Sequence, residues 1–281
     1  MSTTAATNLA DSIRIPTLPA AVERIRVMLA QPDVEMKDVV DAFLQDPPLS
    51  AKVLRIANSA HYGLQEKTTS VRKAVSVLGL RALSQIVLRA GVVTTFADIK
   101  GTAEFSIQDL WKHSILTAQI AECLAKHCLR RASDLASHDF YTCGLLHDLG
   151  KIVLFDNLGE HYLEAVRRAK GEPGQQEVEE HRLLGMSHSE TGHMAAVMWQ
   201  IPEPIPSIIR THHRALNGAG HGELVRVVSC ADEIANAVAQ APAANPKAIR
   251  ARVKSIPGGL SEESLMSVIG IAIASWENIE V

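Results

Sequence analysis

The sequence predicts an all-α protein, on three observations. Hydrophobic residues make up 47% of the 281 residues, which is enough to form a sizeable core. Aromatic residues make up only 4%, whereas β-sheets favour aromatic and β-branched side chains. Apolar residues recur at helical rather than alternating spacing, and no repeat of fixed period occurs. We therefore expect close-packed helices, in one large domain or two small ones.

Helix-breaking residues divide the first hundred residues into short helices. Pro16 and Pro19 keep the chain extended before the first helix, and Pro32 ends that helix. Ser70 is a suitable N-cap for the fourth helix, which Gly79 closes. After the first, the expected helices are residues 36–45, 49–58, 71–78 and 81–96.

Helical spacing continues through the rest of the chain, with a clear break at residues 171–174. The expected helices are residues 111–129, 139–154, 160–169, 176–184, 188–199, 204–213, 224–241 and 262–276. Gly101 and small polar residues form a seam at residues 99–105. We expect a flexible N-terminus over residues 1–14, a helical half over residues 15–105, and a second half over residues 106–281 against which the first packs.

Charge and composition exclude several classes of protein. The 28 basic and 31 acidic residues give a net charge of −3, which excludes a strongly basic nucleic-acid coat and an acidic tail. The apolar runs are far shorter than the roughly 20 residues that span a bilayer, and the first ten residues do not resemble a signal peptide. The four cysteines form no C-x-x-C pair. We expect a reduced, cytoplasmic protein that binds neither membrane nor nucleic acid.

The sharpest local feature is the pair His147-Asp148, which lies in an apolar, helix-like stretch. Ionisable groups in such a stretch are costly to bury unless they are paired or bind a metal. On its own, the pair fits equally well a hydrogen-bonded histidine beside an exposed aspartate.

Further histidines and aspartates in the second half strengthen the metal interpretation. They are Asp109, His113, His188, His212, His213 and Asp232. Mixed imidazole and carboxylate ligands suit Fe, Mn, Co, Ni or Zn rather than Ca. Seven or eight ligands exceed the needs of one tetrahedral ion, so their convergence would imply a two-metal site that clamps a phosphoryl group. Scattered surface histidines remain the alternative, because 12 histidines allow many chance alignments.

A series of motifs resembles one known family in the family's own order. The motifs are IPTLP at 15–19, QDPPL at 45–49, LRIANSA at 54–60, AVSVLG at 74–79, GLLHDLGK at 144–151, HSETG at 188–192, WQIP at 199–202 and HH at 212–213. The chain resembles the HDOD (HD-related output) domain, the regulatory branch of the HD superfamily of metal-dependent phosphohydrolases. The resemblance covers residues 15–213 and extends more weakly to Asp232. It implies an N-terminal helical subdomain packed on an HD-like helical subdomain, and bacterial signal transduction without demonstrated catalysis.

The resemblance also implies a role for each candidate ligand. The ligands of the HD superfamily are matched by His113, His147, Asp148 and Asp232. The extra histidines of the two-metal, cyclic-di-GMP-hydrolysing HD-GYP relatives are matched by His188, His212 and His213. Asp109 occupies the position of an acidic ligand in those relatives, and Lys151 matches a lysine that can hold a phosphate. One or two divalent ions (Fe, Mn, Ni, Co or Zn) are therefore implied.

The substrate side departs from the HD-GYP pattern. Those relatives follow the double histidine with Glu and an Asp-Gly-x-Gly-Tyr-Pro loop, whereas this chain has Arg214 and then NGAGHG at residues 217–222. A loop of this composition is typical of a plain helix connector. We therefore expect a signal-transduction module that acts through contacts with a protein partner, with metal binding optional. The alternative is a metal-dependent phosphohydrolase acting on a nucleotide or cyclic dinucleotide. The expectation of a homodimer rests only on the frequency of such dimers.

Overall fold

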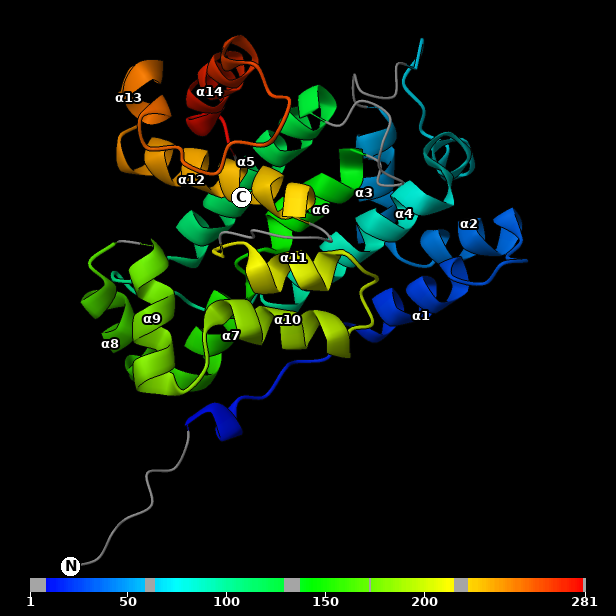
Figure 1. Ribbon diagram of the computed structural model, residues 1–281. Coiled ribbons are helices and arrows are strands. Elements are labelled where there is room, and N and C mark those ends of the chain that lie inside the picture. Colours follow the sequence, from blue (N-terminus) through cyan, green and yellow to red (C-terminus); the bar gives the residue numbers. More distant parts are fainter. Residues whose placement is uncertain (1–8, 59–63, 129–136, 172, 215–221, 280–281) are drawn as a thin grey trace, which may run out of the picture. The chain divides into compact units, whose positions relative to one another are not determined.

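The computed structural model describes residues 9–58, 64–128, 137–171, 173–214 and 222–279 (Figure 1). These residues form helices and connecting turns, with no strand among them, which confirms the predicted all-α fold. The chain divides into two compact units. We call Pro16–Asp98 the N-terminal unit, and Ile99–Val281 together with Met1–Ile15 the C-terminal unit.

The N-terminal unit packs three short helices on one longer helix. These are α1 (Ala20–Leu29), α2 (Met36–Leu44), α3 (Pro47–Ala57) and α4 (Val71–Thr95). Each short helix turns an apolar stripe inward, as with Leu49, Val53 and Ala57 of α3 at four-residue spacing. α3 begins two residues earlier than expected, because Asp46 caps it by accepting a hydrogen bond from the amide of Leu49 (3.0 Å).

Helix α4 is interrupted where the sequence predicted two helices. Gly79 has φ 72° and ψ 163°, a backbone conformation outside the helical region that glycine adopts readily. Before this kink, the Ser70 hydroxyl caps the helix by accepting from the amide of Lys73 (3.3 Å). By length and composition α4 is the one described helix that could cross a membrane, but more than half of its most apolar window is buried in the fold. We interpret α4 as the core helix of the N-terminal unit.

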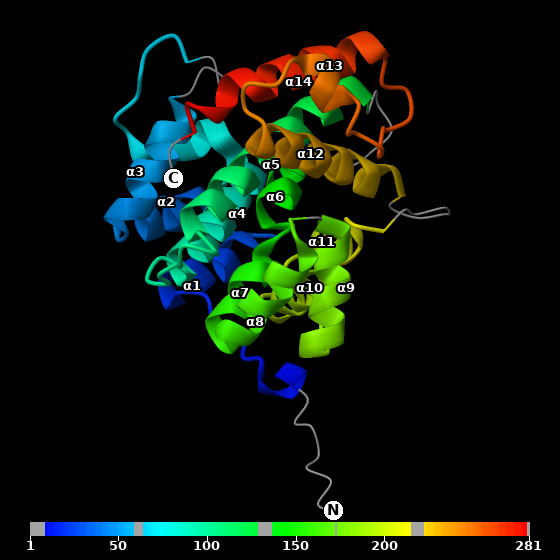
Figure 2. The same ribbon diagram turned by 90° about the vertical axis from the view of Figure 1, so that its left-hand side faces the viewer.

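In the C-terminal unit, α6, α12 and α14 pack on α5, and α7 packs on α8 and α10 (Figure 2). Its helices are α5 (Ile107–Cys128), α6 (Ser137–Leu146), α7 (Leu149–Leu158), α8 (Glu160–Ala169), α9 (Pro173–Leu184), α10 (His188–Met198), α11 (Ile205–Thr211), α12 (Gly222–Gln240), α13 (Pro246–Arg250) and α14 (Glu262–Trp276). One hydrophobic core joins α5, α12 and α14, and a second joins α7, α8 and the end of α9. A short 3₁₀ helix, Leu9–Ser12, precedes Arg14, whose amide donates to Asn157 on α7 (2.7 Å).

The expected single helix over residues 139–154 is wrong. The chain forms α6 and α7, with a turn at His147 and Asp148 between them. The backbone of Asp148 has φ −99° and ψ 9°, and its carbonyl accepts from the amide of Lys151 (2.9 Å). In a continuous helix, neighbouring side chains diverge by about 100°. The turn instead lets both side chains enter the same site.

Two glycines allow the helices of the C-terminal unit to approach closely. A Cβ atom on Gly150 would lie 1.9 Å from the carbonyl oxygen of His188, so only glycine allows α7 and α10 this close. A Cβ atom on Gly144 would lie 2.7 Å from the Cα atom of Ala118 on α5. These contacts bring the turn that carries His147 and Asp148 to the helices that carry the other candidate ligands.

Candidate metal centre

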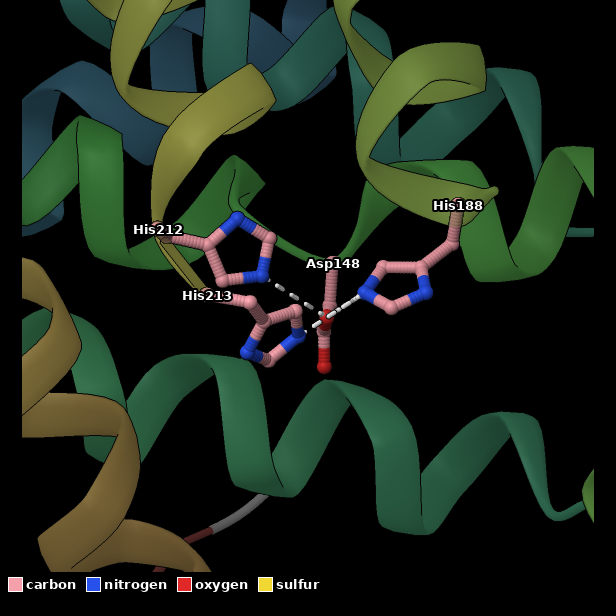
Figure 3. Close-up of side chains that lie close together, drawn as sticks. All are labelled: Asp148, His188, His212 and His213. Carbon is pink, nitrogen blue, oxygen red and sulfur yellow. Dashed lines mark hydrogen bonds and ion pairs between the residues drawn. The ribbon is translucent and has the colours of Figure 1, made fainter. Parts of the chain in front are cut away.

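Seven of the predicted ligand residues converge inside the C-terminal unit. They come from α5, the turn between α6 and α7, the first residue of α10, the end of α11, and α12. One group consists of Asp148, His188, His212 and His213 (Figure 3). The other group consists of His113, His147 and Asp232. Within each group the nitrogen and oxygen atoms that could hold an ion all lie within 4.8 Å of one another.

Asp148 connects the two groups through its separate carboxylate oxygens. Its Oδ1 lies 3.5 Å from Nε2 of His188 and 3.6 Å from Nε2 of His212. Its Oδ2 lies 3.3 Å from Nε2 of His147 and 3.6 Å from Nε2 of His113. One carboxylate therefore faces both groups, which is the arrangement that a bridging ligand between two ions requires.

Three distances between ligand atoms fit a transition-metal ion directly, whereas the Asp148 oxygens lie slightly further, 3.5–3.6 Å, from His188, His212 and His113. Two ligands at 2.0–2.1 Å from one ion lie about 2.8–3.4 Å apart for octahedral to tetrahedral angles. The Nε2 atoms of His113 and His147 are 3.3 Å apart, and Nε2 of His113 is 3.1 Å from Oδ1 of Asp232. In the other group, the Nε2 atoms of His188 and His213 are 3.0 Å apart.

Hydrogen bonds around the cluster orient three of the imidazoles. Nδ1 of His147 donates to the carbonyl of Gly144 (2.7 Å), and Nδ1 of His212 donates to the carbonyl of Ile209 (2.7 Å). Nδ1 of His188 donates to Glu180 (2.6 Å). Because carbonyl and carboxylate oxygens can only accept, each Nδ1 carries a proton, and each Nε2 faces the cluster as the ligand atom.

Sequence reasoning missed Glu180, which lies on α9 and is fully buried. The carboxylate of Glu180 accepts a hydrogen bond from Nδ1 of His188. It also accepts from the backbone amide of His188 (2.7 Å) and from the side-chain amide of Gln176 (2.9 Å). Burial opposes ionisation, but the contacts with His188 outweigh it and lower the pKa of Glu180. The sequence offers no signal that separates Glu180 from its neighbours Glu177 and Glu179, because α9 carries several glutamates.

Two buried atoms in the cluster lack the hydrogen bonds that buried polar groups normally make. Oδ1 of Asp148 and Nε2 of His212 face each other without a hydrogen-bond partner among the described residues. An unsatisfied buried polar group costs about 1–3 kcal/mol. A cation between these atoms would satisfy both, and the mixed nitrogen and oxygen donors suit Fe, Mn, Co, Ni or Zn. The residues therefore fit a metal ion.

The two groups differ in their protonation without metal. Burial lowers the pKa of His212, and burial together with His212 and His188 lowers the pKa of His213 well below its usual value, so both rings are neutral. Burial also acts to lower the pKa of His147, but the carboxylates of Asp148 and Asp232 outweigh it and raise that pKa to about 10. In the metal-free protein, the positive charge of protonated His147 therefore offsets part of the negative charge of Asp148 and Asp232, as a bound cation would.

Lys151 reaches the cluster, whereas Asp109 does not. Nζ of Lys151 lies 2.6 Å from Oδ2 of Asp148, and this ion pair outweighs the effect of burial and raises the pKa of Lys151. Asp109 is exposed in the first turn of α5 and belongs to neither group. Although it shares a helix face with His113, it lies about 6 Å further along the axis. The expectation that Asp109 is a ligand is therefore not supported by the structure.

The cluster is reached from the surface through a cavity of about 680 Å³. His212, His213 and Asp232 lie at its inner end. The expected helix connector at residues 217–222 falls almost entirely outside the described residues, so that expectation stays a prediction.

Comparisons with known proteins bear on the family and the fold of this chain. The family profile of the HDOD domain matches residues 15–215. An uncharacterized protein of Treponema pallidum (strain Nichols) is 29% identical over 213 residues, which cover 75% of this chain but only 40% of that protein. The chain thus spans less than half the length of this curated relative.

Solved structures share the fold over almost the whole chain. An HDOD domain protein of unknown function from Geobacter sulfurreducens is 27% identical, with a TM-score of 0.71 and coverage of 97% of this chain and 96% of that one. A candidate phosphohydrolase from Shewanella amazonensis SB2B is 22% identical, with a TM-score of 0.69 and coverage of 96% and 98%. At that identity, the second likeness shows the fold alone.

Proposed function

Because this chain belongs to the HDOD domain family, we propose that it is a bacterial signal-transduction module whose C-terminal unit holds two divalent metal ions. The observation that carries the metal assignment is the position of Asp148 between two groups of ligand atoms, with Oδ1 facing one and Oδ2 facing the other. The unpartnered Oδ1 of Asp148 and Nε2 of His212 support it further.

Each group of residues would hold one ion. The first ion would be held by His188, His212, His213 and Oδ1 of Asp148, and the second by His113, His147, Asp232 and Oδ2 of Asp148. When bound, such a pair can polarise a phosphoryl group and lower the pKa of a water. In this chain, Glu180 orients His188, and the Lys151 ammonium balances the charge of Asp148.

We propose that the signal leaves the C-terminal unit through α10. This helix begins at the ligand His188, and further along it Met194, Val197 and Met198 are exposed. These three side chains lie at i, i+3 and i+4, so they share one face of the helix. A change in metal occupancy would act on the start of a rigid element whose far end presents an apolar face to a signalling protein.

Metal analysis of purified variants tests the metal assignment. After reconstitution with Fe or Mn, we expect two equivalents of bound metal in the parent protein. We expect about one equivalent of metal in His188→Ala and one in His113→Ala, because each substitution removes a ligand of one group. Asp148→Ala should bind little, because it contributes to both groups. His161→Ala is the matched control, since His161 is exposed on α8. A parent protein that binds no metal would refute the assignment.

Hydrogen exchange tests the regulatory role. Adding metal should slow amide exchange along α10 in the parent protein and leave it unchanged in His188→Ala. Unchanged exchange along α10 in metal-loaded parent protein would contradict the proposed route.

Hydrolysis of a phosphate ester is the second candidate function. It is favoured by Lys151, whose ammonium lies beside the cluster, and by the cavity that reaches His213 and Asp232. Metal-loaded protein should be assayed with phosphodiesters that include cyclic dinucleotides. Turnover that rises with metal content and is lost in Asp148→Ala would establish the hydrolase, whereas full metal content without turnover supports the regulatory module.

A further inference from the structure

The cavity that opens on the metal centre extends well beyond it. It runs from His213 and Asp232 along α12 to Gln240, and the loop after α13 forms its outer wall. This loop, residues 251–255, lies outside the segment that the HDOD family profile matches. The outer half of the cavity is thus a feature of this chain's C-terminal helices.

The cavity wall carries three exposed cationic side chains. Arg214 follows the double histidine, while Arg252 and Lys254 lie on the loop after α13. No described carboxylate forms an ion pair with any of the three. The guanidinium of Arg252 donates to the neutral side-chain oxygen of Gln240, so this contact leaves its charge uncompensated.

The carboxylate of Glu233 in the same wall is already engaged. Its oxygens accept from the amides of Lys254 (2.5 Å) and Ser255 (2.9 Å) and from the hydroxyl of Ser255 (2.8 Å). Glu233 therefore fixes the loop against α12 and places Arg252 and Lys254 at the cavity. Three cationic side chains and the carboxylates of Asp232 and Glu233 thus line the cavity, a net charge of +1, and Arg252 and Lys254 carry the positive charge of the outer wall.

The remaining lining side chains are small or polar. Ser229, Asn236 and Gln240 offer hydroxyl and amide groups, and among the described lining residues the only rings are the imidazoles of His212 and His213. Among the described residues, the outer wall therefore offers no aromatic ring to a nucleobase, and recognition by these residues depends on charge and hydrogen bonds. The volume of about 680 Å³ lies in the range typical of small-molecule sites.

We propose that this cavity binds a small molecule that carries two phosphate groups, one directed to the metal centre and the other to Arg252 and Lys254. The proposal rests on the proposed metal centre, since the inner phosphate needs the ions that His213 and Asp232 would help to hold. The signal that the module receives would then be a bisphosphate that reaches from the metal centre to Arg252 and Lys254.

Calorimetric titration of the metal-loaded full chain tests the proposal. The probes are inorganic phosphate, pyrophosphate, fructose 6-phosphate and fructose 1,6-bisphosphate, at one fixed ionic strength. We expect at least one bisphosphate to bind at least tenfold more tightly than its single-phosphate counterpart. Equal affinity for both members of each pair would overturn the proposal.

A charge-matched pair of variants locates the second phosphate. Arg252→Gln/Lys254→Gln should weaken bisphosphate binding at least tenfold and change single-phosphate binding by less than threefold. Arg226→Gln/Lys247→Gln removes two exposed charges that do not line the cavity, and should change neither. Equal losses in the two double variants would show general electrostatic attraction and overturn the proposal.

Metal content, measured on the same samples, separates this inference from the proposed function. Two equivalents of metal without any preference for bisphosphates would overturn the inference alone. Absence of metal from the parent protein would refute the proposed function, and the inference with it.

Discussion

Replacing Gly150 by alanine is expected to destroy one half of the metal centre while leaving the other half in place. The new Cβ atom would lie 1.9 Å from the carbonyl oxygen of His188 and 2.7 Å from the backbone amide nitrogen of Gly192. Both contacts are to backbone atoms, so no side-chain rotation can relieve them. The helices α7 and α10 must separate, and His188 moves away from Asp148 as they do.

The size of this separation sets the expected effect. A carbon atom does not approach closer than about 3 Å to such atoms, so α10 must move by about 1 Å. Metal–ligand distances tolerate only about 0.2 Å. The group around His188 should therefore lose its ion, whereas the group around His113 keeps one. Overpacking of this kind costs about 1–3 kcal/mol, which lowers Tm by roughly 2–12 °C in a unit of this size.

Gly270→Ala is the matched control for this experiment. Gly270 lies within α14, and a Cβ atom there would meet nothing within 4 Å. Alanine is favoured over glycine inside a helix, so the control should be neutral or stabilised by about 0.5–1 kcal/mol. Metal analysis and thermal unfolding are measured on both variants. Two equivalents of metal in Gly150→Ala, with a Tm equal to that of Gly270→Ala, would refute the reasoning.

Three further predictions follow from the surroundings of the cluster. Glu180→Gln removes the charge that orients His188 and should weaken metal binding at that group 10–100-fold in chelator competition; an unchanged affinity would show that Glu180 only fills space. Asp109→Asn should leave metal content unchanged, because Asp109 is exposed and outside both groups; loss of an ion would restore it as a ligand. In metal-free protein, the raised pKa of His147 stabilises the folded state. This contribution is fully present below about pH 6.5 and is lost as pH rises toward about 10, by up to about 1.4 kcal/mol per pH unit. The lowered pKa values of His212 and His213 have the opposite effect on stability: the folded protein becomes less stable as pH falls below about 6.5. Urea unfolding at pH 5.5, 6.5, 7.5 and 8.5 should thus show greatest stability near pH 6.5, and a steady rise through pH 8.5 would contradict these protonation states.

The sequence was sufficient to predict elements whose boundaries depend on local chemistry. Ser70 and Gly79 marked the two ends of a helix, and the structure shows a cap at the first and a kink at the second. The short helix α13 also had a local signal, because Asn245 caps it and Pro246 occupies its first turn. That helix was not predicted, although the signal could have identified it.

Features that depend on tertiary contacts could not be predicted in this way. Residues 139–154 are continuously compatible with a helix, so only the packing of α7 on α10 reveals the turn at His147 and Asp148. Helical spacing correctly placed Asp109 and His113 on one face, but it does not show how far along the helix the buried site extends. Likewise, the role of Glu180 depends on which side of α9 meets His188.

Anomalous diffraction from crystals grown with Mn or Fe tests the central claim most directly. We predict two peaks in the C-terminal unit, one within about 2.0–2.3 Å of Oδ1 of Asp148 and the other equally close to Oδ2. The first peak should also contact Nε2 of His188, and the second Nε2 of His113. A single peak, or peaks away from Asp148, would contradict the account of a bridged two-metal centre.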